Sequence, residues 1–310
     1  MQITKNAMMS VLVMDTKLAR SPQEIIPRPF GPIHIVEPTS QHTHTAILLH
    51  GRGSTGEEFA DELFESKLSN RLSLADKLPG WRWVFPSSQE HWSAVFEEDL
   101  PAWFEAHSLT DVNARQDLQM PGIKESVDYL QRILDQEIER LGGRSDRVGL
   151  GGISQGAAIG MLTLLCSEHP SRRLGGFVGA STWLPFAENI AETVKRDHGQ
   201  REALQQDGPL VTEATVGANG FVRGMMAPLL RAKAEGVGSD SLLDTPVFLG
   251  HGSDDAYVDA ALGRQARAVL TQLGLRVEWK EYEGAEQEGH WLKTPEEVDD
   301  IAEFLARLGQ

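Results

Sequence analysis

The segment VGLGGISQGAAIGMLTLLC occupies residues 148–166 of the 310-residue chain. Its first four residues form a short apolar strand, residues 152–156 read Gly-x-Ser-x-Gly, and Ala157–Cys166 has the composition of an apolar helix. A serine in this strand–turn–helix context lies on a tight turn that presents its hydroxyl above a sheet, and the helix directs N–H groups towards the reacting oxygen. Chance can also produce the motif in a chain with 30 glycines, but the flanking elements favour a nucleophile at Ser154.

The rest of the chain alternates short apolar strands with amphipathic helices. This alternation predicts a mostly parallel central sheet with helices on both faces. Together with the Gly-x-Ser-x-Gly turn between a strand and a helix, it predicts an α/β-hydrolase fold. The predicted strands are Ala46–His50, Trp83–Phe85, Val148–Gly151, Gly176–Ala180, Val247–Leu249 and the half-exposed edge strand Arg276–Lys280. The predicted helices are Gly122–Leu141, Ala157–Cys166, Ala260–Leu273 and Pro295–Leu308. Thr294 is expected to cap the last helix, with Glu297 three positions after the cap.

A second glycine-rich turn, GRGSTG at residues 51–56, follows the strand Ala46–His50. A strand that ends in His-Gly-x-Gly places backbone N–H groups beside the nucleophile of this fold. We therefore expect the backbone N–H groups of Arg52 and Gln155 to form an oxyanion hole, where each donor contributes about 3 kcal/mol of transition-state stabilisation. A phosphate-binding loop is the competing interpretation, but the lysine of that motif is missing. His50 is expected to anchor the loop, and the side chain of Arg52 has no assigned role.

The acid and the base of this fold follow the nucleophile in that order along the chain. The strand Val247–Leu249 leads into a loop with Asp254 and Asp255, of which Asp255 is preferred as the acid and Asp254 is the close competitor. His290, at the end of a glycine-flanked loop, is the one histidine that follows them in the sequence. His251 fits less well because it shares its loop with the acid. Imidazole can take the proton of a serine hydroxyl near neutral pH and return it to a leaving group, while the acid orients the ring.

Two segments interrupt the alternation of strands and helices. Residues 1–30 are rich in proline and are expected to form an extended lead-in, so that residues 31–310 form a single α/β-hydrolase domain. The stretch from about 186 to 244 is too long for an ordinary connection and is predicted to be an insertion before the acid-bearing strand. Its apolar residues at helical spacing are expected to pack on the domain, with a mobile lid as the alternative; they are Phe221, Met225, Met226, Leu229 and Leu230.

The overall charge excludes several classes of partner. The chain carries 45 acidic and 29 basic residues, a formal charge of −16. Nucleic acid binding requires clustered cations, and the same charge disfavours docking on anionic lipid. The apolar run Met8–Met14 is cut short by Asp15 and is far from the roughly 18 residues of a membrane span. The single cysteine, Cys166, fits a reducing compartment, so a cytoplasmic protein without stable membrane insertion is expected.

Six short segments in order carry a resemblance to a known family. They are Leu49–Gly53, Pro101–Phe104, Gly151–Ala157, Ser181–Pro185, His251–Asp255 and Tyr282–Gly284. With these segments, which span roughly Thr45 to Leu305, the chain resembles the acyl-protein thioesterase family, also described as lysophospholipase-like carboxylesterases.

The resemblance implies a catalytic triad of Ser154, Asp255 and His290, with oxyanion donors at Arg52 and Gln155. It also implies hydrolysis of long-chain acyl thioesters or small carboxylic esters without a metal or cofactor. The partner would then be a small-molecule ester or an acylated protein. A small-molecule carboxylesterase is the first alternative, and a hydrolase-fold protein that only binds a ligand is the second, although candidates for every triad and oxyanion position are present.

Three tryptophans are candidates for substrate contacts. Trp92 and Trp103 lie on the segment that, by the resemblance, would line the acyl site, and Trp183 is the third candidate. Burial in the core is an equally weighted interpretation for each of them. The chain departs from the family in having Arg52 where an apolar residue is usual and in a slightly longer loop before His290. Together with the long insertion, these departures leave the identity of the substrate open.

Overall fold

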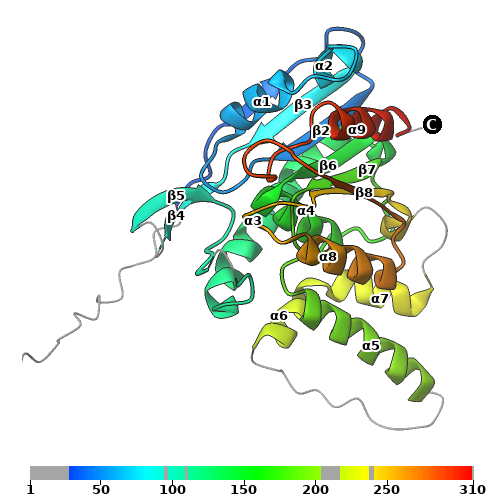
Figure 1. The fold of residues 1–310 in the computed structure, drawn as a ribbon. Helices are drawn as coiled ribbons and strands as arrows, with labels where there is room; N and C mark the ends of the chain where they lie inside the picture. Colours follow the sequence, from blue (N-terminus) through cyan, green and yellow to red (C-terminus); the bar gives the residue numbers. More distant parts are fainter. Residues whose placement is uncertain (1–27, 94–96, 109–110, 204–216, 237–240, 309–310) are drawn as a thin grey trace, which may run out of the picture.

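A seven-stranded sheet lies at the centre of the part of the chain that the structure describes (Figure 1). The structure is a computed structural model, and it describes residues 28–93, 97–108, 111–203, 217–236 and 241–308. β1 pairs antiparallel with β3, and all other neighbours pair in parallel. In spatial order the strands are β1 (Ile33–Val36), β3 (Trp81–Pro86), β2 (His44–Leu49), β6 (Val148–Ile153), β7 (Gly176–Ala180), β8 (Val247–Gly252) and β9 (Val277–Tyr282).

Helices cover both faces of this sheet (Figure 1). One face packs against α1 (Gly56–Glu65), α2 (Leu74–Lys77) and α9 (Glu296–Ala306), and its core contains Phe59, Trp83 and Phe248. The other face packs against α3 (Gln116–Arg140), α4 (Ser154–Leu165) and α8 (Ala260–Leu273), and its core contains Ile123 and Leu150. A separate hairpin of β4 (Gln89–Ser93) and β5 (Glu98–Ala102) projects beyond the sheet. This arrangement confirms the predicted α/β-hydrolase fold.

The predicted strands all overlap observed ones. Arg276–Lys280 coincides with most of β9, which lies at the edge of the sheet with half-exposed residues, as its alternating pattern predicts. The sequence patterns did not identify β1, the β4–β5 hairpin or α1. β1 and the hairpin strands are short, and α1 is an amphipathic helix whose buried residues Phe59, Ala60 and Leu63 stand at helical spacing, a signal that the sequence analysis did not use.

α4 begins at Ser154, three residues before the predicted start at Ala157, and two further predicted helix starts are also wrong. α3 begins at Gln116, six residues before the predicted start at Gly122, and Pro121 lies inside it. The extra turn is held by the side chain of Gln119, which donates to the carbonyl oxygens of Val112 and Ala114.

At the other helix, Thr294 does not cap α9, because Pro295 occupies the cap position and no side chain makes a capping hydrogen bond. The buried carboxyl group of Glu297 instead accepts a hydrogen bond from the backbone N–H of Lys293, which precedes the helix, at 2.9 Å.

The segment between β7 and β8 contains α5 (Ala187–Ala203), α6 (Ala218–Met225) and α7 (Ala227–Glu235). Its apolar residues pack on the domain, as expected. Met226 and Leu229 are buried in the same core as α3 and α4, while Phe221, Met225 and Leu230 pack against that core from its margin. α6 contacts both α5 and α3. Residues 204–216 and 237–240, like residues 1–27 of the predicted lead-in, lie outside the described residues.

Replacement of Leu229 by alanine tests this packing. Leu229 is 1% exposed, so Leu229→Ala is expected to lower the free energy of unfolding by about 2–5 kcal/mol, through lost burial and a residual cavity. Denaturant titration measures the loss. Leu72→Ala is the matched control, because Leu72 is 40% exposed and its truncation is expected to cost less than about 0.5 kcal/mol. Equal small losses in both variants would contradict a structural role for this helix.

Candidate active site

The turn between β6 and α4 presents Ser154 at the first residue of the helix. Ser154 has φ +53°, a left-handed conformation that costs free energy for a residue with a side chain. The strand β2 approaches this turn closely. A Cβ atom at Gly152 would lie 2.4 Å from the Leu49 carbonyl oxygen, and one at Gly156 would lie 2.2 Å from the same oxygen. The two glycines of the motif are therefore required by the close approach of two backbones, as the sequence predicts.

A neighbouring loop fixes the backbone of this turn. The hydroxyl of Thr182, in the loop after β7, donates to the carbonyl oxygen of Ser154 at 2.8 Å. Thr182 is itself buried, so its hydroxyl has little freedom to turn away. The strained residue is thus held from two sides, by β2 and by the loop after β7.

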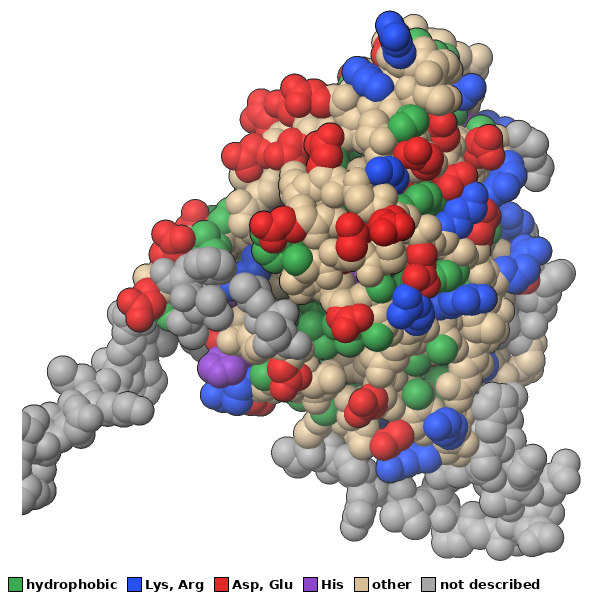
Figure 2. Space-filling model, viewed as in Figure 1, with side chains coloured by type: hydrophobic (Ala, Val, Ile, Leu, Met, Phe, Trp, Pro, Cys, Tyr) green, Lys and Arg blue, Asp and Glu red, His purple; other side chains and the backbone are tan. Residues whose placement is uncertain are grey.

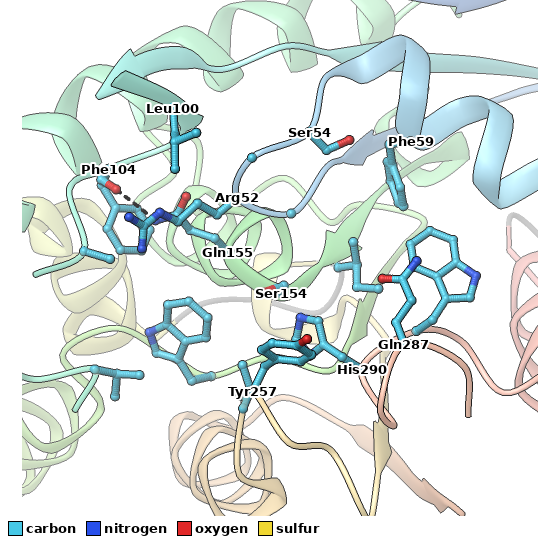
Figure 3. Close-up of a pocket in the computed structure, with 18 of the residues that line it drawn as sticks. Arg52, Ser54, Phe59, Leu100, Phe104, Ser154, Gln155, Tyr257, Gln287 and His290 are labelled. Carbon is cyan, nitrogen blue, oxygen red and sulfur yellow. Dashed lines mark hydrogen bonds between the residues drawn. The ribbon is translucent and has the colours of Figure 1, made fainter. Parts of the chain in front are cut away.

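His290 and Asp255 are brought together by two loops that are far apart in the sequence. The Nδ1 atom of His290 lies 2.8 Å from Oδ2 of Asp255. A Cβ atom at Gly252, in the acid loop, would lie 2.0 Å from the carbonyl oxygen of Gly289, so the loops pack backbone against backbone. His290 and Ser154 line the same cavity, in which Figure 3 shows the imidazole beside the serine.

The carboxylate of Asp255 is completely buried and receives several hydrogen bonds. Its Oδ1 atom accepts from the backbone N–H groups of Tyr257 at 2.8 Å and Val258 at 2.9 Å. His251 reaches the other oxygen, with Nε2 at 3.4 Å from Oδ2, and also donates to the Val258 carbonyl oxygen at 2.9 Å. Burial alone would raise the pKa of Asp255, but the hydrogen bonds from His251 and His290 hold that pKa well below its usual range. The group is therefore an anion at neutral pH.

Asp254, the competing acid, has a different environment. Its side chain accepts hydrogen bonds from the backbone N–H of Gly284 at 3.1 and 3.2 Å, and the residue is exposed. It braces the turn after β9. The geometry therefore favours Asp255 as the partner of His290.

The loop after β2 lies beside the serine. A Cβ atom at Gly51 would lie 3.5 Å from Cβ of Ser154, and the N–H of Gly53 donates to the carbonyl oxygen of Pro101 at 2.8 Å. His50 anchors this loop, as expected. It accepts a hydrogen bond from the N–H of Ser88 at Nε2, and Nδ1 lies 2.7 Å from the Gly51 carbonyl oxygen. Burial lowers the pKa of His50 to about 4, so the ring is neutral.

Gln155 connects the nucleophile turn to the segment after β5. Its side-chain oxygen accepts from the backbone N–H of Trp103 at 3.0 Å, and its amide nitrogen donates to the Phe104 carbonyl oxygen at 2.8 Å. Its own backbone N–H lies in the first turn of α4, where N–H groups have no acceptor within the helix. The predicted oxyanion donors thus come from two elements beside Ser154, Arg52 from the loop after β2 and Gln155 from the first turn of α4.

A cavity of about 710 Å³ opens over Ser154, within the usual range for ligand sites (Figure 3). Much of its wall is apolar. The apolar side chains that line it are Phe59, Leu100, Phe104, Ala106, Val112, Ile153, Trp183, Tyr257, Val258 and Trp291. Among the residues that the structure describes, none of the five apolar insertion residues considered as a lid lines this cavity.

The three predicted tryptophans have different positions. Trp183, the third candidate, lines the cavity. Trp103 does not, because it is fully buried and its indole N–H donates to the His50 carbonyl oxygen at 2.9 Å. Trp92 also does not, because it is 50% exposed on β4. Trp103 therefore supports the loop behind the site, and the prediction that it contacts substrate is corrected together with that for Trp92.

Several cavity residues were missed by the sequence analysis. Tyr257 lies against the His290 ring, with ring centroids 5.4 Å apart and the planes at 61°. Its position two residues after Asp255 is the signal that could have identified it. Phe104 belongs to one of the short segments that carry the family resemblance, but its neighbour Trp103 was chosen instead. Phe59 faces the cavity from α1, which was not predicted.

In the described residues, no group of three or more His, Cys, Asp or Glu side chains could hold a metal ion. No helix of the described chain has both the length and the apolar composition that a bilayer crossing demands.

The fold and the site together define a class of protein. Ser154, on a strained strand-to-helix turn, lines a largely apolar cavity together with His290. The imidazole of His290 is hydrogen-bonded to the buried carboxylate of Asp255. This arrangement is typical of serine hydrolases with the α/β-hydrolase fold.

Comparison with known proteins identifies the family within that class. Residues 31–200 and 216–308 match the model of the phospholipase/carboxylesterase family, and the chain belongs to that family. It is a serine hydrolase that acts on carboxylic esters.

The chain is similar to acyl-protein thioesterase 1 of Gibberella zeae, with 28% identity over 86% of this chain and 92% of the relative. Acyl-protein thioesterase 1 of Yarrowia lipolytica is 28% identical over 85% and 91% of the two chains. The crystal structure of Zea mays acyl-protein thioesterase 2 has a similar fold, with a TM-score of 0.60 at 23% identity, over 89% of this chain and 98% of that one.

Replacement of Gly156 by alanine tests the close approach at the nucleophile turn. The new Cβ atom would overlap the carbonyl oxygens of Leu49 and His50, at 2.2 and 2.4 Å, so the backbone must shift. Gly156→Ala is expected to destabilise the fold by about 1–3 kcal/mol and to lower kcat/KM strongly. Thermal unfolding and ester hydrolysis measure the two effects. Gly224→Ala is the control, because no atom beyond its own stretch of helix lies within 4 Å of the added Cβ. If Gly156→Ala left both the stability and kcat/KM unchanged, the close approach of the two backbones would be contradicted.

Proposed function

We propose that this protein hydrolyses acyl esters and thioesters through an acyl-enzyme on Ser154, with His290 as the general base and Asp255 as the acid that orients it. One observation carries the proposal. The 2.8 Å contact between His290 Nδ1 and Asp255 leaves Nε2 of the ring directed to the cavity that Ser154 also lines. Nucleophile, base and orienting acid are thus available in the order that the chemistry requires.

The first half of the reaction forms the acyl-enzyme. His290 takes the proton of the Ser154 hydroxyl as its oxygen attacks the carbonyl carbon of the substrate. The negative charge that develops on the carbonyl oxygen is met by the backbone N–H groups of Arg52 and Gln155, each contributing about 3 kcal/mol. Collapse of the tetrahedral intermediate breaks the bond to the alcohol or thiol, and His290 donates its proton to that leaving group.

The second half repeats these steps with water as the nucleophile. His290 deprotonates the water, which attacks the acyl carbon, and the proton returns to Ser154 as the acid product leaves. Asp255 stays ionised throughout because its hydrogen bonds hold its pKa below the usual range. Its charge keeps the proton of the neutral imidazole on Nδ1 and stabilises the imidazolium that forms at each step.

The cavity wall supports an acyl chain as the principal recognition element. Leu100, Phe104, Val112 and Trp183 are among the residues that line the cavity, and they supply apolar surface for an acyl chain. Relatives named acyl-protein thioesterase 1 support acylated protein or a small acyl ester as the substrate class. The second candidate, a small-molecule carboxylesterase, uses the same chemistry and is favoured by the family description.

Replacement of Asp255 by asparagine tests the orienting acid. Asparagine keeps the size but offers the imidazole no fixed negative acceptor, so the ring no longer holds its proton on Nδ1 and kcat is expected to fall by about 10⁴. Steady-state hydrolysis of a p-nitrophenyl ester measures the fall. Asp254→Asn is the matched control, since Asp254 only braces Gly284 and its replacement is expected to change kcat/KM by about twofold or less. A larger loss in Asp254→Asn than in Asp255→Asn would reverse the assignment.

A fluorophosphonate probe tests the nucleophile independently of any substrate. The folded wild-type chain is expected to be labelled covalently, and Ser154→Ala is expected to remain unlabelled while keeping its thermal unfolding temperature. Peptide mapping by mass spectrometry locates the adduct. Labelling of Ser154→Ala at the wild-type rate would refute the proposed nucleophile, and a wild-type chain without label would favour a ligand-binding protein.

The length of the acyl chain tests the substrate class. Each CH₂ group that enters the apolar cavity contributes about 0.8 kcal/mol, so kcat/KM is expected to rise about fourfold per CH₂ until the cavity is full. A series of p-nitrophenyl esters and matched thioesters with acyl chains of graded length measures this slope. A maximum at acetyl or propionyl would favour the small-molecule carboxylesterase, and a maximum at long chains would favour an acyl-protein thioesterase.

A further inference from the structure

The cavity carries one positively charged side chain that the proposed mechanism does not use, that of Arg52. Among the described residues that line it, Arg52 is the sole lysine or arginine. Three glutamates also border the cavity, Glu62, Glu98 and Glu288, but all three are exposed, whereas Arg52 is half-buried. The three glutamate carboxylates therefore lie nearer to the solvent than the guanidinium of Arg52 does.

The position of Arg52 is fixed by its neighbours. Gly51, on one side, lies within van der Waals distance of the Ser154 side chain, and Gly53, on the other, is bonded to the Pro101 carbonyl oxygen at 2.8 Å. Figure 3 shows the Arg52 side chain directed towards the end of the cavity where Leu100 and Phe104 lie, away from His290. The backbone of Arg52 thus lies beside the expected position of the reacting carbonyl group, and its charged side chain extends along the wall of the cavity.

Burial makes this charge unusually effective. Desolvation lowers the pKa of Arg52, and the attraction of the Glu105 carboxylate opposes that shift without outweighing it. A guanidinium nevertheless stays protonated in proteins, because its intrinsic pKa lies far above neutrality. An anionic group that enters the cavity would accept charge-assisted hydrogen bonds from the planar guanidinium, whose half-buried charge is screened less than an exposed one.

We propose that Arg52 makes this enzyme selective for substrates that carry an anionic oxygen group, a carboxylate or a phosphate, close to the scissile ester or thioester bond. The inference rests on the proposed function and adds a substrate class to it. The anion can belong to the acyl half, as in a half-ester or half-thioester of a dicarboxylic acid, or to the leaving group, as in an ester of a phosphorylated alcohol. Both sources present the same chemistry to the guanidinium.

The acidic surface of the molecule does not oppose this selectivity at short range. Figure 2 shows acidic side chains gathered over α1, and the whole chain has a formal charge of −16. Exposed charges are screened over about 8–10 Å at physiological ionic strength. The half-buried guanidinium acts within hydrogen-bonding distance, so the surface charge slows the approach of an anion without cancelling its binding.

Two pairs of substrates, each matched except for the anion, test the inference on the full-length enzyme. For the acyl half they are p-nitrophenyl glutarate with a free carboxylate and its methyl ester. For the leaving group they are the butyrate esters of 4-hydroxyphenyl phosphate and of 4-methoxyphenol. The quantity measured is the ratio of kcat/KM for the anionic and neutral member, in wild type, Arg52→Leu and Arg52→Lys. Because both members are assayed on one sample, the ratio is independent of the folded fraction.

The wild-type ratio for at least one pair is expected to fall about tenfold or more in Arg52→Leu, because a hydrogen bond to a charged group is lost. Arg52→Lys, which keeps the charge but not the planar fork, is expected to lie between them. The pair that responds identifies which half of the substrate carries the anion. Arg223→Leu is the matched control, since it removes one exposed positive charge on α6 and is expected to keep the wild-type ratio.

Two other outcomes separate the inference from the proposed function. If all variants hydrolyse the neutral esters and neither ratio changes by more than about twofold, Arg52 does not select anions and the hydrolase proposal stands. A wild-type enzyme that hydrolyses no member of either pair, and that the fluorophosphonate probe does not label, refutes the hydrolase proposal itself.

Discussion

The buried carboxylate of Asp255 is the interaction on which the geometry of the site depends. It is fully removed from water, and its charge is compensated by the backbone N–H groups of Tyr257 and Val258 and by the rings of His251 and His290. A buried charge without such donors would cost several kcal/mol. The loop after β8 and the loop that carries His290 must therefore assemble together, because neither can bury its part of the network alone.

Close backbone contacts give this assembly its precision. Gly252 lies against the Gly289 carbonyl oxygen, and Gly156 lies against the carbonyl oxygens of Leu49 and His50. Glycine has no side chain that could change its rotamer, so these contacts join one backbone directly to another. The relative positions of the loops are therefore fixed by the van der Waals radii of backbone atoms. The strained φ of Ser154 persists because these contacts and the Thr182 hydroxyl determine it from several directions.

The parts of the structure that the sequence predicted are those with local signals. The glycine–serine turn, the parallel strands and the position of His290 at the end of its loop all depend on short-range backbone chemistry. The wrong predictions concern side-chain direction. Trp103 lies next to Phe104 in the chain, but of the two only Phe104 lines the cavity. The indole of Trp103 is buried instead, and its N–H donates a hydrogen bond to the His50 carbonyl oxygen. The unexpected start of α3 has a similar origin, because the side chain of Gln119 holds an extra turn that no periodic pattern reveals.

The loops at the carboxyl ends of the strands border the cavity over Ser154, whereas the described apolar residues of α6 and α7 pack in or against the core. These borders are the loop after β2, the β4–β5 hairpin, the loop after β7 that carries Trp183, the acid loop and the loop that carries His290. Arg52 is on the first of these and Leu100 on the second, and the Gly53–Pro101 hydrogen bond links the two elements. A change in the hairpin would thus be transmitted to the loop that carries both a proposed oxyanion donor and the guanidinium, which couples recognition of the substrate to stabilisation of its transition state.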